Sequence, residues 1–225
     1  MEIIYEDNHL IAVNKKAGEI VQGDKTGDET LADAVKDYLK KKYKKPGNVF
    51  LGVTHRIDRP VSGVVVFART SKALSRLNEM IKKHQVSKTY WAVVRRRPKV
   101  ACGALTHYLV RNPEKNISVA YDNEVRNSQL ATLYYRIAGE IGDLTVLEID
   151  LRTGRHHQIR VQLAKIGCPI VGDIKYGDEW PNQDGSICLH SRKMEFVHPV
   201  TKVPLEITAD LPQGPVWDEF RGRQQ

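Results

Sequence analysis

The sequence predicts an α+β protein in which a mixed, largely antiparallel sheet is flanked by a few helices. Short runs rich in β-branched and aromatic residues recur along the chain, and such runs are typical of strands. Three longer stretches instead place apolar residues at helical spacing, between capping and stop signals. No internal repeat, low-complexity linker or change of composition divides the chain. We therefore expect residues 1–225 to form a single domain.

The composition is that of an ordinary globular protein with an excess of basic residues. Hydrophobic residues make up 41% and charged residues 28% of the chain. The 35 lysines and arginines exceed the 27 acidic residues, which gives a net charge of +8. A polyanion partner would explain this excess, although many basic proteins bind no nucleic acid.

Cysteine usage and the amino terminus both favour a cytoplasmic protein. The three cysteines lie far apart without Cys-x-x-Cys spacing, and their odd number argues against a disulfide framework. Residues 1–16 contain no basic segment that leads into a long apolar one. We therefore expect neither a signal peptide nor a membrane span.

The first half of the chain is predicted to contain a hairpin, a helix, a strand pair and a second helix. These elements span residues 3–5 and 10–13, 28–43, a segment ending at 53 with the run 63–68, and 71–84. Asp28 or Thr30 is expected to cap the first helix, and Thr70 or Ser71 the second. The run 63–68 is so apolar that we expect it to be buried on both faces.

The end of the first predicted helix is strongly basic. Residues 40–45 read Lys-Lys-Lys-Tyr-Lys-Lys, and a Pro-Gly pair follows. Lysines at this position complement the helix macrodipole on a solvated face, but they could also contact phosphate. The sequence leaves both alternatives open.

The second half of the chain is predicted to be richer in strands. They span residues 87–94, 117–120, 131–135, 144–149, 187–197 and 204–208. Gly154 is expected to open a third helix that ends at Gly167, with Ile159, Leu163 and Ile166 as its buried side. A short helix is expected from Pro215.

One polar loop lies between two predicted core elements, the segment ending at Val53 and the run 63–68. It carries His55, Arg56, Asp58 and Arg59. Side chains on a loop held by rigid elements can be both exposed and fixed, so catalytic groups are often placed there. An Arg-x-Asp sequence can equally be a plain surface ion pair.

A second motif, from Leu151 to Gly177, reads LRTGRHHQIRVQLAKIGCPIVGDIKYG. Together with the His-Arg-Ile-Asp loop it resembles the RluA-like family of RNA pseudouridine synthases. That family has H-R-L-D-x-x-[TS]-S-G around its catalytic aspartate and T-G-R-x-H-Q-I-R later in the chain. This sequence departs from the family pattern at Ile57, Val61 and Gln162. The resemblance extends over nearly the whole chain.

The resemblance carries most of the fold assignment and all of the assigned activity. It implies the pseudouridine synthase fold as a single catalytic domain, with a central active-site cleft where the loop before Gly63 meets the third helix. We expect no S4-type RNA-binding domain, because the predicted hairpin begins at Ile3. The implied reaction isomerises uridine in ribosomal or transfer RNA to pseudouridine, which breaks the C1′–N1 bond and forms a C1′–C5 bond.

The resemblance also assigns roles to residues. Asp58 would be the catalytic aspartate, Arg160 its ion partner, and Tyr90 the tyrosine that packs against the sugar and base. Arg56 would fill the gap that the flipped uridine leaves. The remaining expected RNA contacts are His55, Arg155, His157 and Gln158.

The implied reaction includes no redox change and no phosphoryl transfer, so no cofactor is expected. No obligate protein partner is evident from the sequence. Histidine is a common metal ligand, but His156 and His157 occupy adjacent positions, which point apart on a helix, so no metal site is expected. The motifs assign no role to Lys15.

The main alternative is a non-catalytic RNA-binding or assembly factor on the same fold. Such a protein has no need of the acidic Asp58 where it would repel phosphate. A glycoside hydrolase would normally require a second carboxylate near Asp58, and the motifs supply none. A kinase would require a glycine-rich phosphate loop, which is missing.

Overall fold

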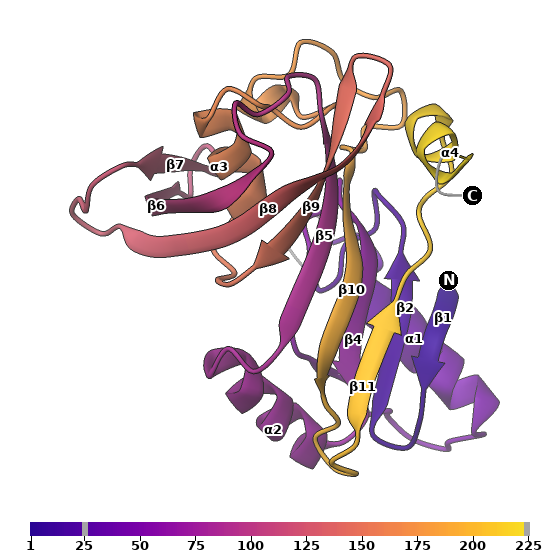
Figure 1. Ribbon diagram of the computed structural model, residues 1–225. Helices are drawn as coiled ribbons and strands as arrows, with labels where there is room; N and C mark the ends of the chain where they lie inside the picture. Colours follow the sequence, from indigo (N-terminus) through magenta and orange to yellow (C-terminus); the bar gives the residue numbers. More distant parts are fainter. Residues whose placement is uncertain (24–26, 223–225) are drawn as a thin grey trace. The chain divides into compact units, whose positions relative to one another are not determined.

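The computed structural model describes residues 1–23 and 27–222, and it divides into two compact units (Figure 1). Unit 1 contains Met1–Val86 and Ser191–Asp210. Unit 2 contains Ser87–His190 and Leu211–Gln225. The chain therefore leaves unit 1, returns to it and leaves it again, and no change of composition marks these crossings. The single catalytic domain expected from the sequence stays a prediction.

Unit 1 contains the predicted hairpin and the final strand pair. Its strands are β1 (Glu2–Glu6), β2 (Leu10–Lys15), β3 (Gly52–Val53), β4 (Ser62–Ala68), β10 (Leu189–Val197, whose first two residues belong to unit 2) and β11 (Pro204–Thr208). The order is β1-β2-β4-β10-β11, and β3 also pairs with β4. The pairs β1–β2, β2–β4, β3–β4 and β10–β11 are antiparallel.

Strand β4 is the centre of unit 1, and all seven of its residues are buried, as predicted. On one face, Val64 and Val66 share a hydrophobic cluster with Ala73 and Leu77 of α2 (Ser71–Lys82). At the start of the strand, Gly63 has a φ of +115°, and a Cβ there would overlap the backbone of Ser191. A glycine is therefore required at this position.

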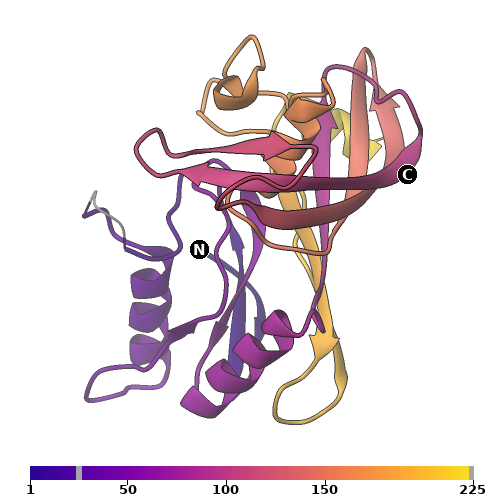
Figure 2. The same ribbon diagram turned by 90° about the vertical axis from the view of Figure 1, so that its left-hand side faces the viewer.

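Helix α1 (Leu31–Lys42) and helix α2 begin at threonine caps. The side chain of Thr30 accepts a hydrogen bond from the Asp33 N–H, and that of Thr70 accepts one from the Ala73 N–H. One of the two predicted caps is thus correct for each helix. Helix α1 begins three residues later than predicted, because Thr30 rather than Asp28 takes the capping position. The two helices lie well apart in both views of the molecule (Figures 1 and 2).

Unit 2 is an antiparallel sheet covered in part by helices. Its strands are β5 (Ser87–Val94), β6 (Cys102–Asn112), β7 (Ile117–Tyr121), β8 (Gln129–Ile141) and β9 (Leu144–Leu151), in the order β5-β9-β8-β6-β7. Helix α3 (Gln158–Lys165) packs on β6 and β7, as Figure 1 shows, and α4 (Pro215–Gly222) contacts β8. A short 3₁₀ turn, η1 (Ile174–Tyr176), lies beside α3. The predicted α+β class with a largely antiparallel sheet is confirmed.

The third helix differs from its prediction at its start. It begins at Gln158, not at Gly154, and His157 before it has a left-handed backbone with a φ of +53°. The residues Gly154–His157 therefore form a turn that precedes the helix. A glycine followed by polar residues resembles a helix start in sequence, but the hydrogen bonds of this turn compete with the helix, as described below.

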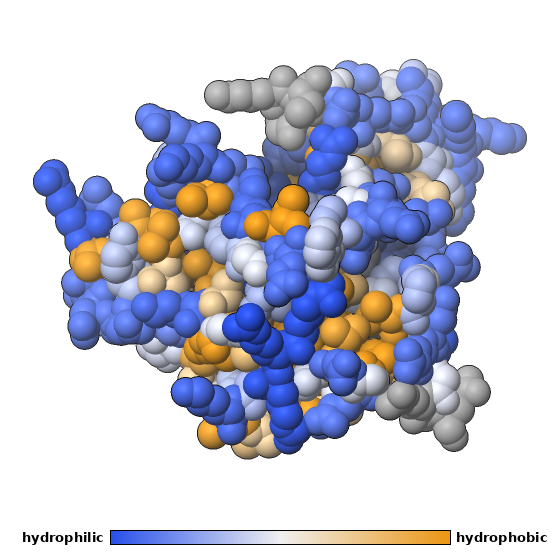
Figure 3. Space-filling view, turned by 90° about the horizontal axis from the view of Figure 1, so that it is seen from above, coloured by the Kyte–Doolittle hydropathy of each residue, from blue (hydrophilic) through white to orange (hydrophobic). Residues whose placement is uncertain are grey.

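One face of the molecule shows the character of its surface. The face in Figure 3 shows hydrophilic side chains over most of its area, with small groups of exposed apolar side chains between them. In unit 2 the exposed large apolar side chains include Val119, Leu130 and Trp180. Among the described residues, no helix has both the length and the apolar character needed to cross a membrane.

Candidate active site

The candidate site residues fall into two groups, one in each unit. Unit 1 contains His55, Arg56 and Asp58, all in the loop before β4. Unit 2 contains the others: Tyr90 on β5, and Arg155, His157, Gln158 and Arg160 in and before α3. The expected pairing of Asp58 with Arg160 joins residues of different units, and it stays a prediction. Within each unit, hydrogen bonds hold the candidate groups in place.

Asp58 opens a tight turn whose backbone is fixed on both sides. The Val61 N–H donates to the Asp58 carbonyl at 3.0 Å and so closes the turn. The Gly18 N–H donates to the Arg59 carbonyl at 2.8 Å, and the Arg59 Nε donates back to the Gly18 carbonyl at 3.1 Å. The half-buried Asp58 side chain therefore projects from a rigid loop, as a catalytic group requires.

Lys15, to which the sequence assigned no role, holds this turn from inside unit 1. Its side chain is completely buried, and its Nζ donates to the carbonyl oxygens of Val61 at 2.7 Å, Lys16 at 2.9 Å and Arg59 at 3.1 Å. Burial lowers the pKa of the Lys15 ammonium to about 8, while Glu19 and Asp58 oppose this shift. Lys15 is therefore a positioning residue for the Asp58 turn.

The lowered pKa of Lys15 leads to a prediction about stability and pH. Between pH 8 and the ordinary lysine value of 10.5, the unfolded chain still binds a proton that folded Lys15 has lost. Stability contributed by this group therefore rises with pH across that window. We expect the difference in Tm between the wild type and Lys15→Met to increase from pH 8 to pH 10.5.

The control for this experiment is Lys16→Met, which removes an exposed lysine next to it. Its Tm difference from the wild type should stay nearly constant over the same pH range. An equally constant difference for Lys15→Met would show that the buried amine does not titrate in this window.

His55 and Arg56 differ in their surroundings. The His55 Nε2 accepts a hydrogen bond from the Val66 N–H at 3.0 Å, and the Thr54 hydroxyl donates to the Val66 carbonyl at 2.6 Å. These two bonds anchor the loop to β4, so His55 has a structural task whether or not it also contacts RNA.

Arg56 is exposed, and the described residues include no hydrogen-bond or ion-pair partner for it. An exposed guanidinium on a fixed loop suits the expected insertion into RNA.

Arg160 is held by a carboxylate of its own unit. Its Nε and Nη2 donate to the two carboxylate oxygens of Asp173 at 2.7 and 2.9 Å, and both side chains are at most 5% exposed. The guanidinium also lies 5.1 Å from the ring centroid of Tyr176. A guanidinium has five N–H donors. The pair with Asp173 is therefore compatible with the expected second pair with Asp58.

The turn before α3 is fixed by Gln158. Its Oε1 accepts from the Thr153 hydroxyl at 2.7 Å and from the Arg155 N–H at 3.0 Å, and its Nε2 donates to the Thr132 carbonyl at 3.1 Å. These bonds explain why the helix starts at Gln158 rather than at Gly154. The Arg155 Nε also donates to the Leu130 carbonyl. A helix opening at Gly154 would have placed Arg155 in its first turn. Arg155 is exposed and lies before the helix instead.

His156 and His157 precede the helix, so the helical geometry assumed for them was wrong. Their rings stack with centroids 3.7 Å apart. The Ser118 hydroxyl lies 2.9 Å from the His156 Nδ1, and the Tyr176 hydroxyl lies 2.8 Å from the His157 Nδ1. Within the described part of the chain, no group of three or more His, Cys, Asp or Glu side chains could hold a metal ion.

His157 is buried beside the positively charged Arg160. Burial lowers its pKa well below the usual range, and the nearby positive charge of Arg160 lowers it further. The Ser118 N–H donates to the Tyr176 hydroxyl at 2.7 Å, and this hydroxyl lies 2.8 Å from the His157 Nδ1. The expected contact of His157 with RNA stays a prediction, and its described contact links the turn to η1.

Gln162, where the family pattern has histidine, is completely buried in α3. Its Nε2 lies 3.1 Å from the Leu105 carbonyl oxygen, 3.2 Å from that of Ala131 and 3.0 Å from the Nδ1 of His107. The amide therefore joins the helix to β6 and β8. In this chain Gln162 therefore stabilises the packing of α3 on the sheet of unit 2.

Tyr90 lies on β5 opposite Ile149 of β9 and is 7% exposed. Its expected contact with the sugar and base stays a prediction.

The residues that sequence reasoning missed are Lys15 and Asp173. Asp173 was part of the quoted motif, and a buried Arg160 needs a carboxylate partner, so that requirement could have pointed to it.

Comparison with known proteins agrees with this architecture. Residues 9–165 match the family model described as RNA pseudouridylate synthase. The structure is similar to the solved structure of human RNA pseudouridylate synthase domain containing 4, with a TM-score of 0.81 and 24% identity, over 99% of this chain and 93% of that one. The fold is thus that of the pseudouridine synthases. The chain belongs to the RNA pseudouridylate synthase family, and the RluA-like resemblance is confirmed.

Two relatives illustrate the range of the family. The ribosomal large subunit pseudouridine synthase D of Xylella fastidiosa is 34% identical over 230 residues, which cover 95% of this chain and 66% of the relative. The tRNA pseudouridine synthase C of Vibrio cholerae is 32% identical over 239 residues, which cover 96% of this chain and 93% of the relative. This chain thus spans 66% of the length of the first relative and nearly all of the second.

Proposed function

We propose that this protein is an RNA pseudouridine synthase that isomerises specific uridines of ribosomal or transfer RNA. Membership of the family supports this activity, and the names of the two relatives supply the two classes of RNA. The observation that carries the proposal is Asp58, an acidic side chain on a turn that Lys15 and Gly18 hold rigidly. An enzyme gains from such rigidity, whereas a protein that only binds RNA gains nothing from a carboxylate near phosphate.

Asp58 acts at C1′ of the target uridine. Its carboxylate either attacks C1′ or assists removal of a proton from the sugar, and both roles require the ionised form. The C1′–N1 bond breaks, the uracil turns, and C5 bonds to C1′. Asp58 is released from C1′, or the proton that it took returns to the sugar, as the C1′–C5 bond forms. The C5 proton is then lost, which restores the C5=C6 double bond, and N1 takes up a proton, so uridine and pseudouridine have the same composition. No electron acceptor and no phosphoryl donor takes part, so the proposal requires no cofactor.

Arg160 and Tyr90 support this chemistry from unit 2. A guanidinium beside the Asp58 carboxylate would pair with its negative charge, and the bidentate pair with Asp173 holds that guanidinium in place. Tyr90 would pack on the base and accept the C5 proton at the end. Arg155, His157, Gln158 and His55 would contact the RNA directly or hold the groups that do.

The proposal is tested by mapping pseudouridines in total RNA from cells with and without the gene. We expect one or a few positions in ribosomal or transfer RNA to lose the modification and to regain it on incubation with purified protein. If no position changes and the purified protein modifies no cellular RNA, the non-catalytic RNA-binding factor replaces the enzyme as the better assignment.

The exposed Arg56 leads to a prediction about base flipping. A stacked uridine must leave its stack at a cost of about a few kcal/mol, and a side chain that fills the gap offsets that cost. We expect Arg56→Ala to lower kcat/KM on a folded stem–loop RNA at least about tenfold more than on a flexible single strand. Single-turnover assays on the two substrates provide this comparison.

Arg56→Lys is the matched control because it keeps the positive charge but loses the planar group that fills the gap. We expect it to resemble Arg56→Ala on the stem–loop. Equal losses on both substrates, with full rescue by lysine, would instead identify Arg56 as a phosphate contact.

A further inference from the structure

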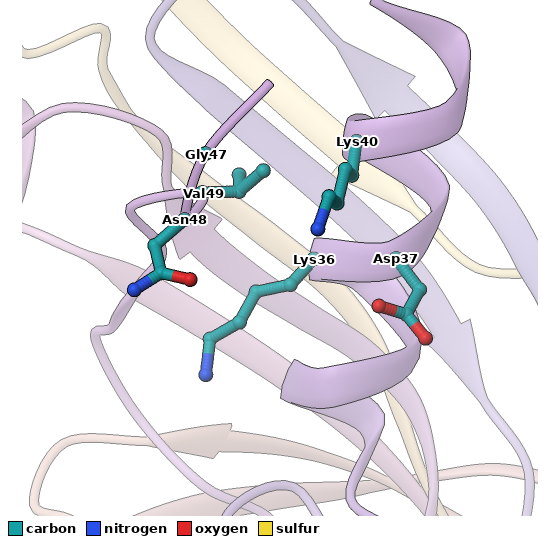
Figure 4. Close-up of a pocket in the computed structure, with 6 residues that line it drawn as sticks. All are labelled: Lys36, Asp37, Lys40, Gly47, Asn48 and Val49. Carbon is teal, nitrogen blue, oxygen red and sulfur yellow. The ribbon is translucent and has the colours of Figure 1, made fainter. Parts of the chain in front are cut away.

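A shallow cleft lies between α1 and the segment that follows it in unit 1 (Figure 4). It has a volume of about 320 Å³ and is lined by Lys36, Asp37, Lys40, Gly47, Asn48 and Val49. Neither the two sequence motifs that resemble the family nor the proposed mechanism uses any of these residues. The cleft is therefore a separate feature of this unit.

The side chains give this cleft a positive lining. Figure 4 shows Lys36 and Lys40 reaching from the helix toward the segment 47–49, with Asp37 on the same helix as the one acidic residue of the lining. The Asn48 amide lies at the opposite wall. Lys36 also contacts the exposed Asp33 at 3.2 Å, a pair that solvent screens strongly. Two ammonium groups, one carboxylate and a neutral amide thus line the cleft, which leaves a net positive charge.

The second half of α1 and the residues just after it contain more lysines than nearby acids neutralise, and two of these lysines line the cleft. The group consists of Lys36, Lys40, Lys41, Lys42, Lys44 and Lys45. Lys42 pairs with Glu6 at 2.8 Å. For Lys40, Lys41, Lys44 and Lys45, which are all exposed, the described residues provide no ion-pair partner. The excess of positive charge therefore remains available to an anionic partner.

The helix dipole favours Lys40, Lys41 and Lys42, which lie in the last turn of α1, but it does not account for Lys36. The carbonyls of Leu39, Lys40 and Lys41 at the end of α1 already accept hydrogen bonds from the N–H groups of Tyr43, Lys45 and Lys44, respectively. These three carbonyls therefore need no side-chain donor. Lys36 also lies more than one turn before the end of the helix, where the dipole has little effect.

We propose that this cleft, formed by Lys36, Lys40 and Asn48, binds the phosphodiester backbone of the substrate RNA. The proposal rests on the proposed function and adds an anchoring site to it. Ammonium groups act as point charges that suit phosphate, and the bare backbone at Gly47 leaves room for close approach of a sugar–phosphate chain. A concave site lined by two cations favours a phosphate chain that can enter it over a flat anionic membrane.

The test compares the double variant Lys36→Gln/Lys40→Gln with Lys72→Gln/Lys82→Gln. The control removes the same charge from exposed lysines on α2 of the same unit. The probe is a fluorescently labelled stem–loop RNA with uridines in its loop, and Kd is measured at several salt concentrations. Each phosphate contact contributes about 0.7 to 0.9 to the slope of log Kd against log salt. Relative to the wild type, we expect the slope of log Kd against log salt to be smaller by about 1 to 2 in the cleft variant. The slope of the control variant should decrease clearly less.

Turnover separates this inference from the proposed function. We expect the cleft variant to raise KM about tenfold at low salt, with a much smaller effect on kcat, because phosphate contacts position RNA and do not take part in bond breaking. A Kd and salt slope equal to those of the control would overturn the inference, as would reduced binding to anionic vesicles with unchanged RNA affinity. If the wild type proves inactive on all RNA, the salt slope still decides whether the cleft binds phosphate.

Discussion

Replacing Asp58 by asparagine is expected to reduce conversion of uridine to pseudouridine to background while the protein stays folded and binds RNA. The amide has nearly the shape of the carboxylate, but it can neither attack C1′ nor accept a proton from the sugar. A positioned base or nucleophile typically contributes at least about 10²–10⁴-fold to the rate, so the loss should be at least that large. Release of tritium from C5-labelled uridine measures it directly.

RNA affinity should persist or increase slightly in Asp58→Asn, because the change removes a negative charge that would lie near phosphate. The matched control is Asp28→Asn, which neutralises the exposed carboxylate that pairs with Arg59 beside the same turn. We expect the control to retain activity within a few-fold of the wild type. A folded Asp58→Asn variant that forms pseudouridine at the normal rate would remove Asp58 from the mechanism.

The second large effect concerns stability and Asp173. Arg160 and Asp173 form a bidentate pair at 2.7 and 2.9 Å in which both partners are buried. Asp173→Asn leaves the guanidinium without this compensating charge. Breaking one side of a buried pair typically costs about 3–5 kcal/mol. We expect a loss of this size in the free energy of unfolding, measured by urea denaturation.

The control is Glu148→Gln, which breaks a pair of the same geometry on the surface of the same unit. The Arg136 guanidinium donates to both carboxylate oxygens of Glu148 at 2.9 and 2.8 Å, but its side chain is 61% exposed. Such a pair contributes about 0–1 kcal/mol. Equal losses in the free energy of unfolding for the two variants would show that the buried Arg160–Asp173 pair stabilises the protein no more than the surface pair does.

Asp173→Asn also tests the role proposed for Arg160. If the Asp173 carboxylate directs the guanidinium toward Asp58, turnover should fall even at a temperature where the variant is fully folded. Normal turnover by the folded variant would mean that the pair serves stability alone.

Several features of this protein could be predicted from local sequence. The run 63–68 proved to be buried on both faces, strand 87–94 has the predicted bounds, and Thr30 and Thr70 cap their helices. These features depend on side-chain type, spacing and short-range hydrogen bonds, all of which are local. The His-Arg-Ile-Asp motif likewise placed Asp58 on a loop before a buried strand, where the structure has it.

Other features depend on contacts between residues far apart in the chain. The burial of Lys15 under the carbonyls of Arg59 and Val61 could not be predicted, because a lysine in a polar turn reads as a solvated side chain. The division into two units was also unforeseen, since the chain crosses between them without any change of composition.

The sequence by itself determined the family, the α+β class and the position of the candidate catalytic aspartate, because these follow from motifs and from local periodicity. Only the tertiary structure decided which groups hold the site residues in place. Gln158 bonds to Thr132, Thr153 and the Arg155 backbone, and these bonds delay the start of α3 and place the two histidines before the helix. Asp173 similarly becomes the partner of Arg160 because burial of a guanidinium requires a nearby carboxylate, and only the folded chain brings that carboxylate within reach.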